Sequence, residues 1–140
     1  MLSGYSQGAH VISDVLHGLS SNLRKRIAVV VLFADPVFDP LDNSLVQLGS
    51  WDPSWAGTLI NFRLGKIKGA NSQFPVYTYC SDGDAVCQGS SRNYVFGTWS
   101  FRPDRASSAK ALKIHGEYEQ YTASAAKLAV KAVRRQVSAK

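Results

Sequence analysis

The stretch Gly4-Tyr5-Ser6-Gln7-Gly8 constrains this chain more than any other feature. It reads G-x-S-x-G, a pattern typical of a sharp turn from a strand into a helix that leaves the serine hydroxyl exposed. Because glycine has no Cβ, we expect both glycines to permit a tight turn and a close approach of the helix to the strand. The first N–H groups of that helix would point toward the same spot and could stabilise a negative charge there.

The residues around this turn fit a strand–helix–strand order. Residues 1–3 are predicted to end a strand, and residues 7–20 carry apolar side chains at helical spacing. The apolar run 27–34 is rich in β-branched residues, as in a strand that is buried on both faces of a parallel sheet. Asp35-Pro36 ends that run. The order and the short connections predict an α/β fold with a parallel sheet.

Residues 35–74 are the least regular part of the sequence. They contain proline, glycine and asparagine together with Trp51, Trp55 and Phe62, without clear periodicity. A long irregular segment inside a compact domain often carries function. The simplest interpretation is a surface excursion pinned by its own tryptophans, and the alternative is a flap that binds substrate.

The C-terminal half contains a second strand and a closing helix. Residues 75–79 are predicted to form a short strand that stops at Cys80. Residues 106–137 are rich in Ala and Lys and carry apolar side chains at helical spacing, which predicts a closing helix beginning near Gly116 or Glu117. No composition shift marks a boundary, so residues 1–140 are expected to form a single domain.

The composition is that of a soluble globular domain. The chain has 140 residues, of which 45% are hydrophobic and 19% charged, which excludes the disordered class. The longest apolar run, 27–34, is too short to span a membrane, so no transmembrane segment is expected. Polar residues interrupt the start of the chain, so the sequence contains no recognisable signal peptide.

The net charge of +6 is concentrated toward the C-terminus. The basic residues there are Lys127, Lys131, Arg134, Arg135 and Lys140. Positions 127, 131 and 135 would form a basic stripe on a helix, and a solvated outer face is the simplest interpretation. Contact with a membrane or an anionic polymer is the alternative. Nucleic acid is not an expected partner, because no aromatic residues alternate with these charges.

The exposed serine could act as a nucleophile if a base and an acid accompany it. A serine hydroxyl is a poor nucleophile at pH 7, so Ser6 needs a base within hydrogen-bonding reach and an acid that orients the base. His10 and His17 lie on the helix that follows the turn and cannot easily face Ser6. His115 precedes the last helix, next to the flexible Gly116. We therefore favour His115 as the base over a purely structural role.

Several aspartates between Ser6 and His115 could supply the acid: Asp35, Asp39, Asp42, Asp52, Asp82, Asp84 and Asp104. Asp35 follows the first buried strand, although Asp-Pro there is equally a simple end to the strand. Asp82 and Asp84 follow the second strand, between the only two cysteines of the chain. If those cysteines formed a disulfide, the short loop would fix the position of an acid firmly.

Two motifs in this sequence resemble those of the cutinase family. Residues 80–87 are similar to the family signature C-x-x-G-D-x-V-C, and residues 4–9 match its form of the serine turn. The family also has its histidine between this cysteine-bounded loop and the last helix. The resemblance implies that Ser6 is the nucleophile, His115 the base and Asp84 the acid, with Asp82 outside the triad.

The resemblance also implies a disulfide between Cys80 and Cys87, and therefore an oxidising, secreted setting. Two reduced core cysteines are the alternative. A metal site is not expected, because the cysteines have no partner ligands at zinc spacing. No cofactor is expected.

The resemblance implies an α/β-hydrolase fold with three layers around a parallel sheet, and the activity of a serine esterase. Such an enzyme would hydrolyse carboxylic esters of cutin, lipid, polyester or acylated polysaccharide through an acyl-enzyme, as a monomer. The backbone N–H of Gln7 and a second donor would hold the oxyanion. A lipase-like or acyltransferase activity at the same serine is a variant of this interpretation.

The sequence departs from the family before the serine turn. Cutinases have earlier strands there, and the second oxyanion donor comes from that region. We therefore expect an N-terminally truncated form of the domain, whose first strand is left as an open edge of the sheet. The alternative function is a catalytically incompetent remnant or a non-catalytic binding domain.

Overall fold

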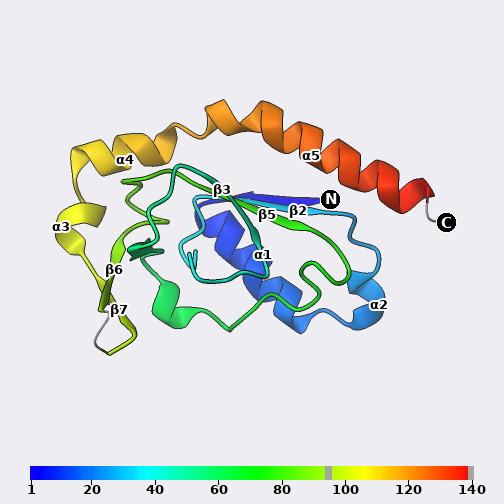
Figure 1. Cartoon of the computed structure of the whole chain (residues 1–140), viewed down its shortest axis with the longest axis horizontal. Coiled ribbons are helices and arrows are strands. Elements are labelled where there is room, and N and C mark those ends of the chain that lie inside the picture. The colour runs from blue at the N-terminus through cyan, green and yellow to red at the C-terminus, as the bar shows by residue number, and fades with distance from the viewer. Residues whose placement is uncertain (94–95, 139–140) are drawn as a thin grey trace.

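A computed structural model of the chain describes residues 1–93 and 96–138 (Figure 1). The helices are α1 (Gln7–Gly18), α2 (Ser21–Arg24), α3 (Pro103–Ala106), α4 (Ala109–Gly116) and α5 (Glu119–Ser138), with a 3-10 turn at Ile60–Phe62. The strands are β1 (Leu2–Tyr5), β2 (Val30–Phe33), β3 (Val46–Gly49), β4 (Trp55–Ala56), β5 (Val76–Cys80), β6 (Ser90–Asn93) and β7 (Thr98–Phe101).

The main sheet is parallel and has helices on both faces. Its strand order is β1-β2-β5-β3, and the register aligns Leu2 with Val30 and Val30 with Val76. Helix α5 crosses one face and α1 covers the other, which gives three layers (Figure 1). Within the described residues β1 pairs only with β2, so β1 forms one edge of this sheet. The α/β fold with a parallel sheet is therefore as predicted.

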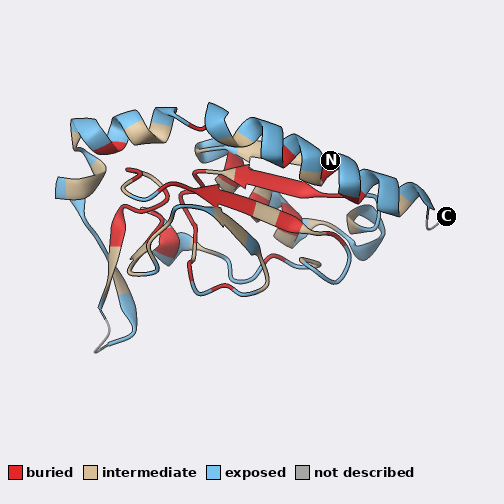
Figure 2. Cartoon of the chain, turned by 45° about the horizontal axis from the view of Figure 1, so that its top comes forward, coloured by how far each residue is buried: buried red, intermediate tan, exposed pale blue. Residues whose placement is uncertain are grey.

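Strand β2 is buried on both faces, as its continuous apolar run predicts. Val30 and Leu32 pack into the cluster that contains Leu16 of α1, whereas Val29 and Val31 pack into the cluster beneath α5. Each such side chain contributes about 1.5–3 kcal/mol by leaving water. Buried residues accordingly concentrate on the central strands, while the outer faces of the helices are exposed (Figure 2).

The prediction of an irregular excursion over residues 35–74 was wrong in two places. Strand β3 joins the main sheet beside β5, and β4 pairs with β6 in a separate antiparallel sheet of three strands. The sequence gives no sign of β3 because a strand at the edge of a sheet is partly exposed and needs no alternating apolar pattern. Val46, for example, is 38% exposed. Gly49 at its end has φ 100° and a backbone so close to Cys80 that a Cβ would lie 2.2 Å from the carbonyl oxygen.

The helix boundaries also differ from the sequence-based expectation. Helix α1 ends at Gly18, and Ser20 caps α2, where its hydroxyl accepts a hydrogen bond from the N–H of Leu23 at 3.3 Å. In the C-terminal part, α5 begins at Glu119, close to the predicted start. The residues before it form α4, which Ser108 caps by accepting from the N–H of Ala111 at 3.1 Å.

Candidate active site

Ser6 occupies a strained turn between β1 and α1. Its φ and ψ are 55° and −126°, although a residue with a Cβ avoids positive φ. The Ser6 N–H donates to the carbonyl of Phe33 on the neighbouring strand at 2.9 Å, which fixes the turn at the carboxyl end of the sheet. The serine therefore lies at the carboxyl end of the sheet, where the loops that follow the parallel strands gather.

The two glycines of the turn have different roles. A Cβ on Gly4 would lie 2.6 Å from the carbonyl oxygen of Gly8, so only glycine lets α1 begin this close to β1. A Cβ on Gly8 would meet nothing within 4 Å. The expectation that both glycines serve the close approach is therefore correct for Gly4 and wrong for Gly8.

A chain of hydrogen bonds joins Ser6, His115 and Asp84. Ser6 Oγ lies 3.0 Å from His115 Nε2, and His115 Nδ1 lies 3.0 Å from Asp84 Oδ2. His115 precedes the last helix, as the sequence indicates, and lies in the last turn of α4. The residues before it favour a helix because they are Ala- and Lys-rich and follow a serine cap.

The Asp84 carboxylate is completely buried, and the backbone of its own loop binds one of its two oxygens. Its Oδ1 accepts hydrogen bonds from the N–H groups of Val86 at 2.6 Å and Cys87 at 2.8 Å. The disulfide between Cys80 and Cys87 closes the loop directly after β5. The buried carboxylate thus has one oxygen fixed by the backbone and the other aligned on the imidazole.

Asp35, the alternative acid after the first buried strand, bonds to groups other than His115. Its side chain accepts hydrogen bonds from the N–H of Val37 at 3.0 Å and the hydroxyl of Ser13 at 3.2 Å. Burial raises the pKa of the Asp35 carboxyl above its usual range, against these hydrogen bonds. His10 lies on the same helix as Ser13 and pairs with Asp14, four residues further along, at 3.3 Å.

The other aspartates are also engaged elsewhere. Asp39 and Asp42 both pair with Arg63, and Asp104 pairs with Arg102. Asp82 is the second acid of the cysteine-bounded loop. Its side chain is 58% exposed and pairs with Arg105 at 3.2 Å. Asp52 accepts from the N–H of Ser54 in its own turn.

Two tyrosines that were absent from the sequence-predicted site surround the histidine. The ring of Tyr5 stacks on the imidazole of His115, and the buried Tyr118 hydroxyl accepts from the N–H of Ser81 at 2.9 Å. Burial and the nearby negative charge of Asp84 raise the pKa of Tyr118, so it stays neutral. Tyr118 belongs to the 106–137 segment, whose apolar spacing predicted only a closing helix, and it lies directly before α5. Tyr5 occupies a position of the turn whose identity the motif leaves open.

The start of α1 supplies backbone donors beside Ser6. The Ser6 carbonyl accepts from the N–H groups of Ala9 and His10, which closes the first turn of the helix. The N–H of Gln7, the first helical residue, belongs to the donors that an α-helix leaves without an intrahelical acceptor. It adjoins the serine hydroxyl in sequence and carries the partial positive charge of the helix terminus.

A parallel sheet between helical layers, with a serine on the strand–helix turn, defines the α/β-hydrolase fold. The profile of the family described as Cutinase matches residues 1–133, so the chain belongs to the cutinase family.

A solved structure, an iodinated complex of acetyl xylan esterase, is similar with a TM-score of 0.54 at 16% identity. The match covers 96% of this chain but 58% of that chain, so this chain spans little more than half the length of its structural relative. A likeness at this identity concerns the fold alone. No curated protein matches the sequence.

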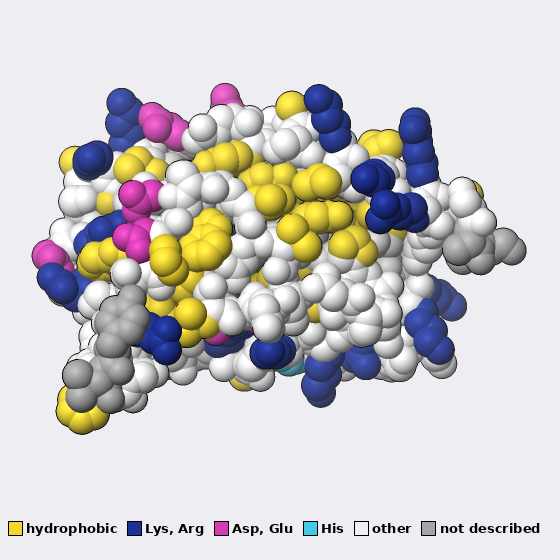
Figure 3. Space-filling model, viewed as in Figure 1, with side chains coloured by type: hydrophobic (Ala, Val, Ile, Leu, Met, Phe, Trp, Pro, Cys, Tyr) yellow, Lys and Arg dark blue, Asp and Glu magenta, His cyan; other side chains and the backbone are white. Residues whose placement is uncertain are grey.

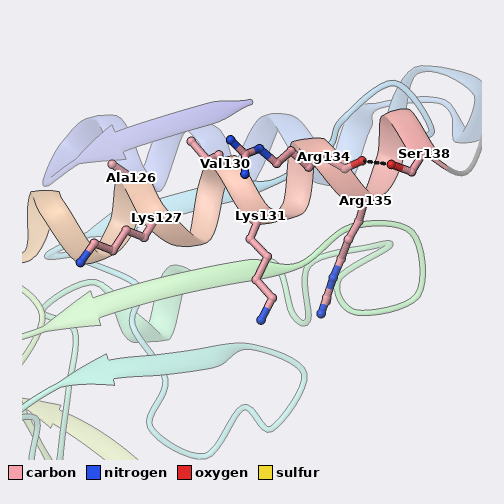
Figure 4. Close-up of a pocket in the computed structure, with 7 residues that line it drawn as sticks. All are labelled: Ala126, Lys127, Val130, Lys131, Arg134, Arg135 and Ser138. Carbon is pink, nitrogen blue, oxygen red and sulfur yellow. Dashed lines mark hydrogen bonds between the residues drawn. The ribbon is translucent and has the colours of Figure 1, made fainter.

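The basic residues of the C-terminal helix border an open groove on α5. The groove has a volume of about 770 Å³ and its lining is Ala126, Lys127, Val130, Lys131, Arg134, Arg135 and Ser138 (Figure 4). Apolar side chains gather on this side of the molecule, with lysines and arginines at the margin (Figure 3). Lys140 lies outside the described residues. No described helix has the length and apolar character needed to cross a membrane.

Proposed function

We propose that this chain is a serine esterase in which Ser6 is the nucleophile, His115 the general base and Asp84 the acid that orients the imidazole. The observation that carries the proposal is the hydrogen-bonded chain from Ser6 Oγ through both ring nitrogens of His115 to Asp84, at 3.0 Å in each step. Family membership supports ester hydrolysis as the reaction class.

The proposed reaction begins when Ser6 Oγ attacks the acyl carbon of a carboxylic ester. His115 Nε2 accepts the hydroxyl proton, and the carboxylate of Asp84 stabilises the imidazolium that results. The carbonyl oxygen becomes an oxyanion, toward which the N–H of Gln7 donates. One such donor is worth roughly 10²- to 10³-fold in rate.

The tetrahedral intermediate then collapses. The bond to the alcohol oxygen breaks, and the imidazolium returns its proton to the departing alcohol. Water attacks the acyl-enzyme next, with His115 as the base again, and the carboxylic acid leaves as Ser6 is regenerated. The sequence of steps needs no metal or cofactor.

The proposed substrates are esters of cutin, lipid, polyester or acylated polysaccharide, and the proposed setting is extracellular. The disulfide between Cys80 and Cys87 supports an oxidising compartment. Acetylated xylan belongs in the substrate panel because the similar solved structure is an acetyl xylan esterase.

Labelling with a fluorophosphonate tests the proposal directly. We expect the probe to modify Ser6 in folded protein, as located by peptide mass spectrometry, and Ser6→Ala to abolish both labelling and hydrolysis of p-nitrophenyl esters. Ser3→Ala, which changes an exposed serine on β1, the strand that leads into the turn, is the control and should keep both. A folded protein that is neither labelled nor active would favour the non-catalytic alternative instead.

A further inference from the structure

The helix that carries His115 is lightly packed. Ala111 is its one buried residue, and Leu112 is 53% exposed. The location of α4 on the body of the protein therefore depends on a few specific contacts rather than on a broad apolar face. At its C-terminal end the hydroxyl of Tyr5 donates to the carbonyl of His115.

The middle of α4 lies directly against the loop that carries Asp84. The N–H of Ala85 donates to the carbonyl of Ala111 at 3.3 Å. Gly83 has φ 80°, and a Cβ there would lie 3.2 Å from Ile114 Cδ1. A small slide of α4 over this loop would therefore change the distance between His115 and Asp84.

Arg105 lies on α3, the short helix before α4, and contacts both the loop that carries Asp84 and strand β4. Its Nη2 lies 3.2 Å from Asp82 Oδ1, two residues before Asp84 in the loop. Its guanidinium carbon lies 3.8 Å from the ring centroid of Trp55 on β4. The cation is thus held between a carboxylate and an indole, a geometry in which arginine is attracted to the aromatic face.

We infer that Arg105 is a positioning residue that fixes the segment carrying His115 against the loop carrying Asp84. The inference rests on the proposed function and gives a role to Asp82, which stands outside the Ser6–His115–Asp84 contacts, and to Trp55 from the irregular central region. Arg105 touches none of these three residues in the contacts above; it acts through the placement of α4.

The ion pair itself contributes little to folding. The side chain of Asp82 is 58% exposed, and ion pairs that are exposed to water add little to stability. A displacement of about 1 Å at a reacting group, by contrast, can cost up to about 10²-fold in rate. Loss of Arg105 should therefore reduce turnover far more than stability.

The test compares Arg105→Ala, Arg105→Lys and Asp82→Asn with the matched control Arg102→Ala. Arg102 is exposed, and its guanidinium pairs with Asp104 beside the same short helix. We expect Arg105→Ala and Asp82→Asn to lower kcat for a p-nitrophenyl ester about tenfold with KM within twofold. Arg105→Lys, which keeps the charge but not the flat stacking group, should recover part of the loss.

A second readout follows His115 without turnover. The ¹⁵N chemical shifts of its ring report which nitrogen carries the proton, and contact with Asp84 should hold it on Nδ1. Arg105→Ala and Asp82→Asn should move these shifts, and Arg102→Ala should not. If Arg105→Ala fails to fold, Asp82→Asn still tests the inference through kcat and the ring shifts.

The inference is overturned if Arg105→Ala and Asp82→Asn match Arg102→Ala in both kcat and ring shifts. If the wild-type protein hydrolyses no ester, the proposed function fails and the ring shifts alone decide. Shifts that change in Arg105→Ala then still support the positioning role, and unchanged shifts reject it.

Discussion

The ring of Tyr5 stacks on the imidazole of His115, with ring centroids 5.0 Å apart and planes inclined by 24°. The hydroxyl of the same tyrosine donates a hydrogen bond to the backbone carbonyl of His115. The residue immediately before Ser6 therefore contacts both the ring and the backbone of the histidine that Ser6 meets. Through this one side chain, β1 and the C-terminal end of α4 are tied together.

Substitution of Tyr5 should separate the two contacts. Tyr5→Phe keeps the stacked ring and loses the hydroxyl, so we expect kcat/KM for ester hydrolysis to fall about threefold or less. Tyr5→Ala removes the ring that limits the imidazole and should cost about tenfold or more. Steady-state kinetics on the two variants checks this. Equal rates for both would mean that stacking does not restrain His115.

Asp84→Asn should lower kcat roughly 10³- to 10⁴-fold, because an amide can donate to Nδ1 and favours the wrong imidazole tautomer. Asp35→Asn is the control, since Asp35 is also buried but bonds to Ser13 and the N–H of Val37. Its effect on kcat should stay within about threefold at equal folded fraction. Similar losses in both variants would argue against Asp84 as the orienting acid.

The two glycines of the serine turn should respond oppositely to alanine. Gly4→Ala would force a Cβ within 2.6 Å of a backbone oxygen, so we expect a loss of several kcal/mol or no soluble protein. Gly8→Ala meets open space on a helix and should be neutral or stabilise by up to about 1 kcal/mol. Urea unfolding distinguishes these outcomes. A destabilised Gly8→Ala would contradict the open space seen beside α1.

Breaking the disulfide should weaken both stability and activity. The bridge closes a short loop between Cys80 and Cys87, for which chain entropy gives about 2–3 kcal/mol of stabilisation. Cys80→Ala/Cys87→Ala should lower the free energy of unfolding by about that amount. Its kcat should also fall, because the loop orders the N–H groups that hold Asp84. Unchanged kcat in the folded double variant would show that the Asp84 loop keeps its shape without the bridge.

Asp35 should give stability a pH dependence of definite sign. Burial raises its pKa in the folded protein, so the folded state binds this proton more tightly than the unfolded state, whose value is about 4. The resulting stabilisation is present below about pH 4 and is lost as pH rises through the folded value. Asp35→Asn cannot lose a proton. Its stability relative to wild type should therefore increase from pH 4 to pH 8 in urea unfolding, and a constant difference would contradict the raised pKa.

Local patterns in the sequence predicted those features that a few adjacent residues can specify. The turn around Ser6, the doubly buried β2 and the cysteine-bounded loop each follow from a short contiguous stretch, because backbone conformation and strand burial are encoded locally. The α/β fold with a parallel sheet followed from the order of these stretches.

Features set by distant partners needed the tertiary structure. Nothing near Val46 in sequence marks β3 as a sheet member, since its partner Tyr77 lies thirty-one positions further along. Likewise, Asp82 and Asp84 are both acids in one loop, and only packing turns Asp84 inward to His115 and Asp82 outward to Arg105.

The sequence by itself determined the chemical groups and the turn that exposes the serine, through residue types at fixed local spacing. The tertiary structure alone decided which groups meet: Tyr5 on the imidazole, Asp84 on Nδ1, and Arg105 between Asp82 and Trp55. The physical reason is that such contacts join segments far apart in the chain. Their geometry depends on how the sheet stacks those segments and not on the residues beside them.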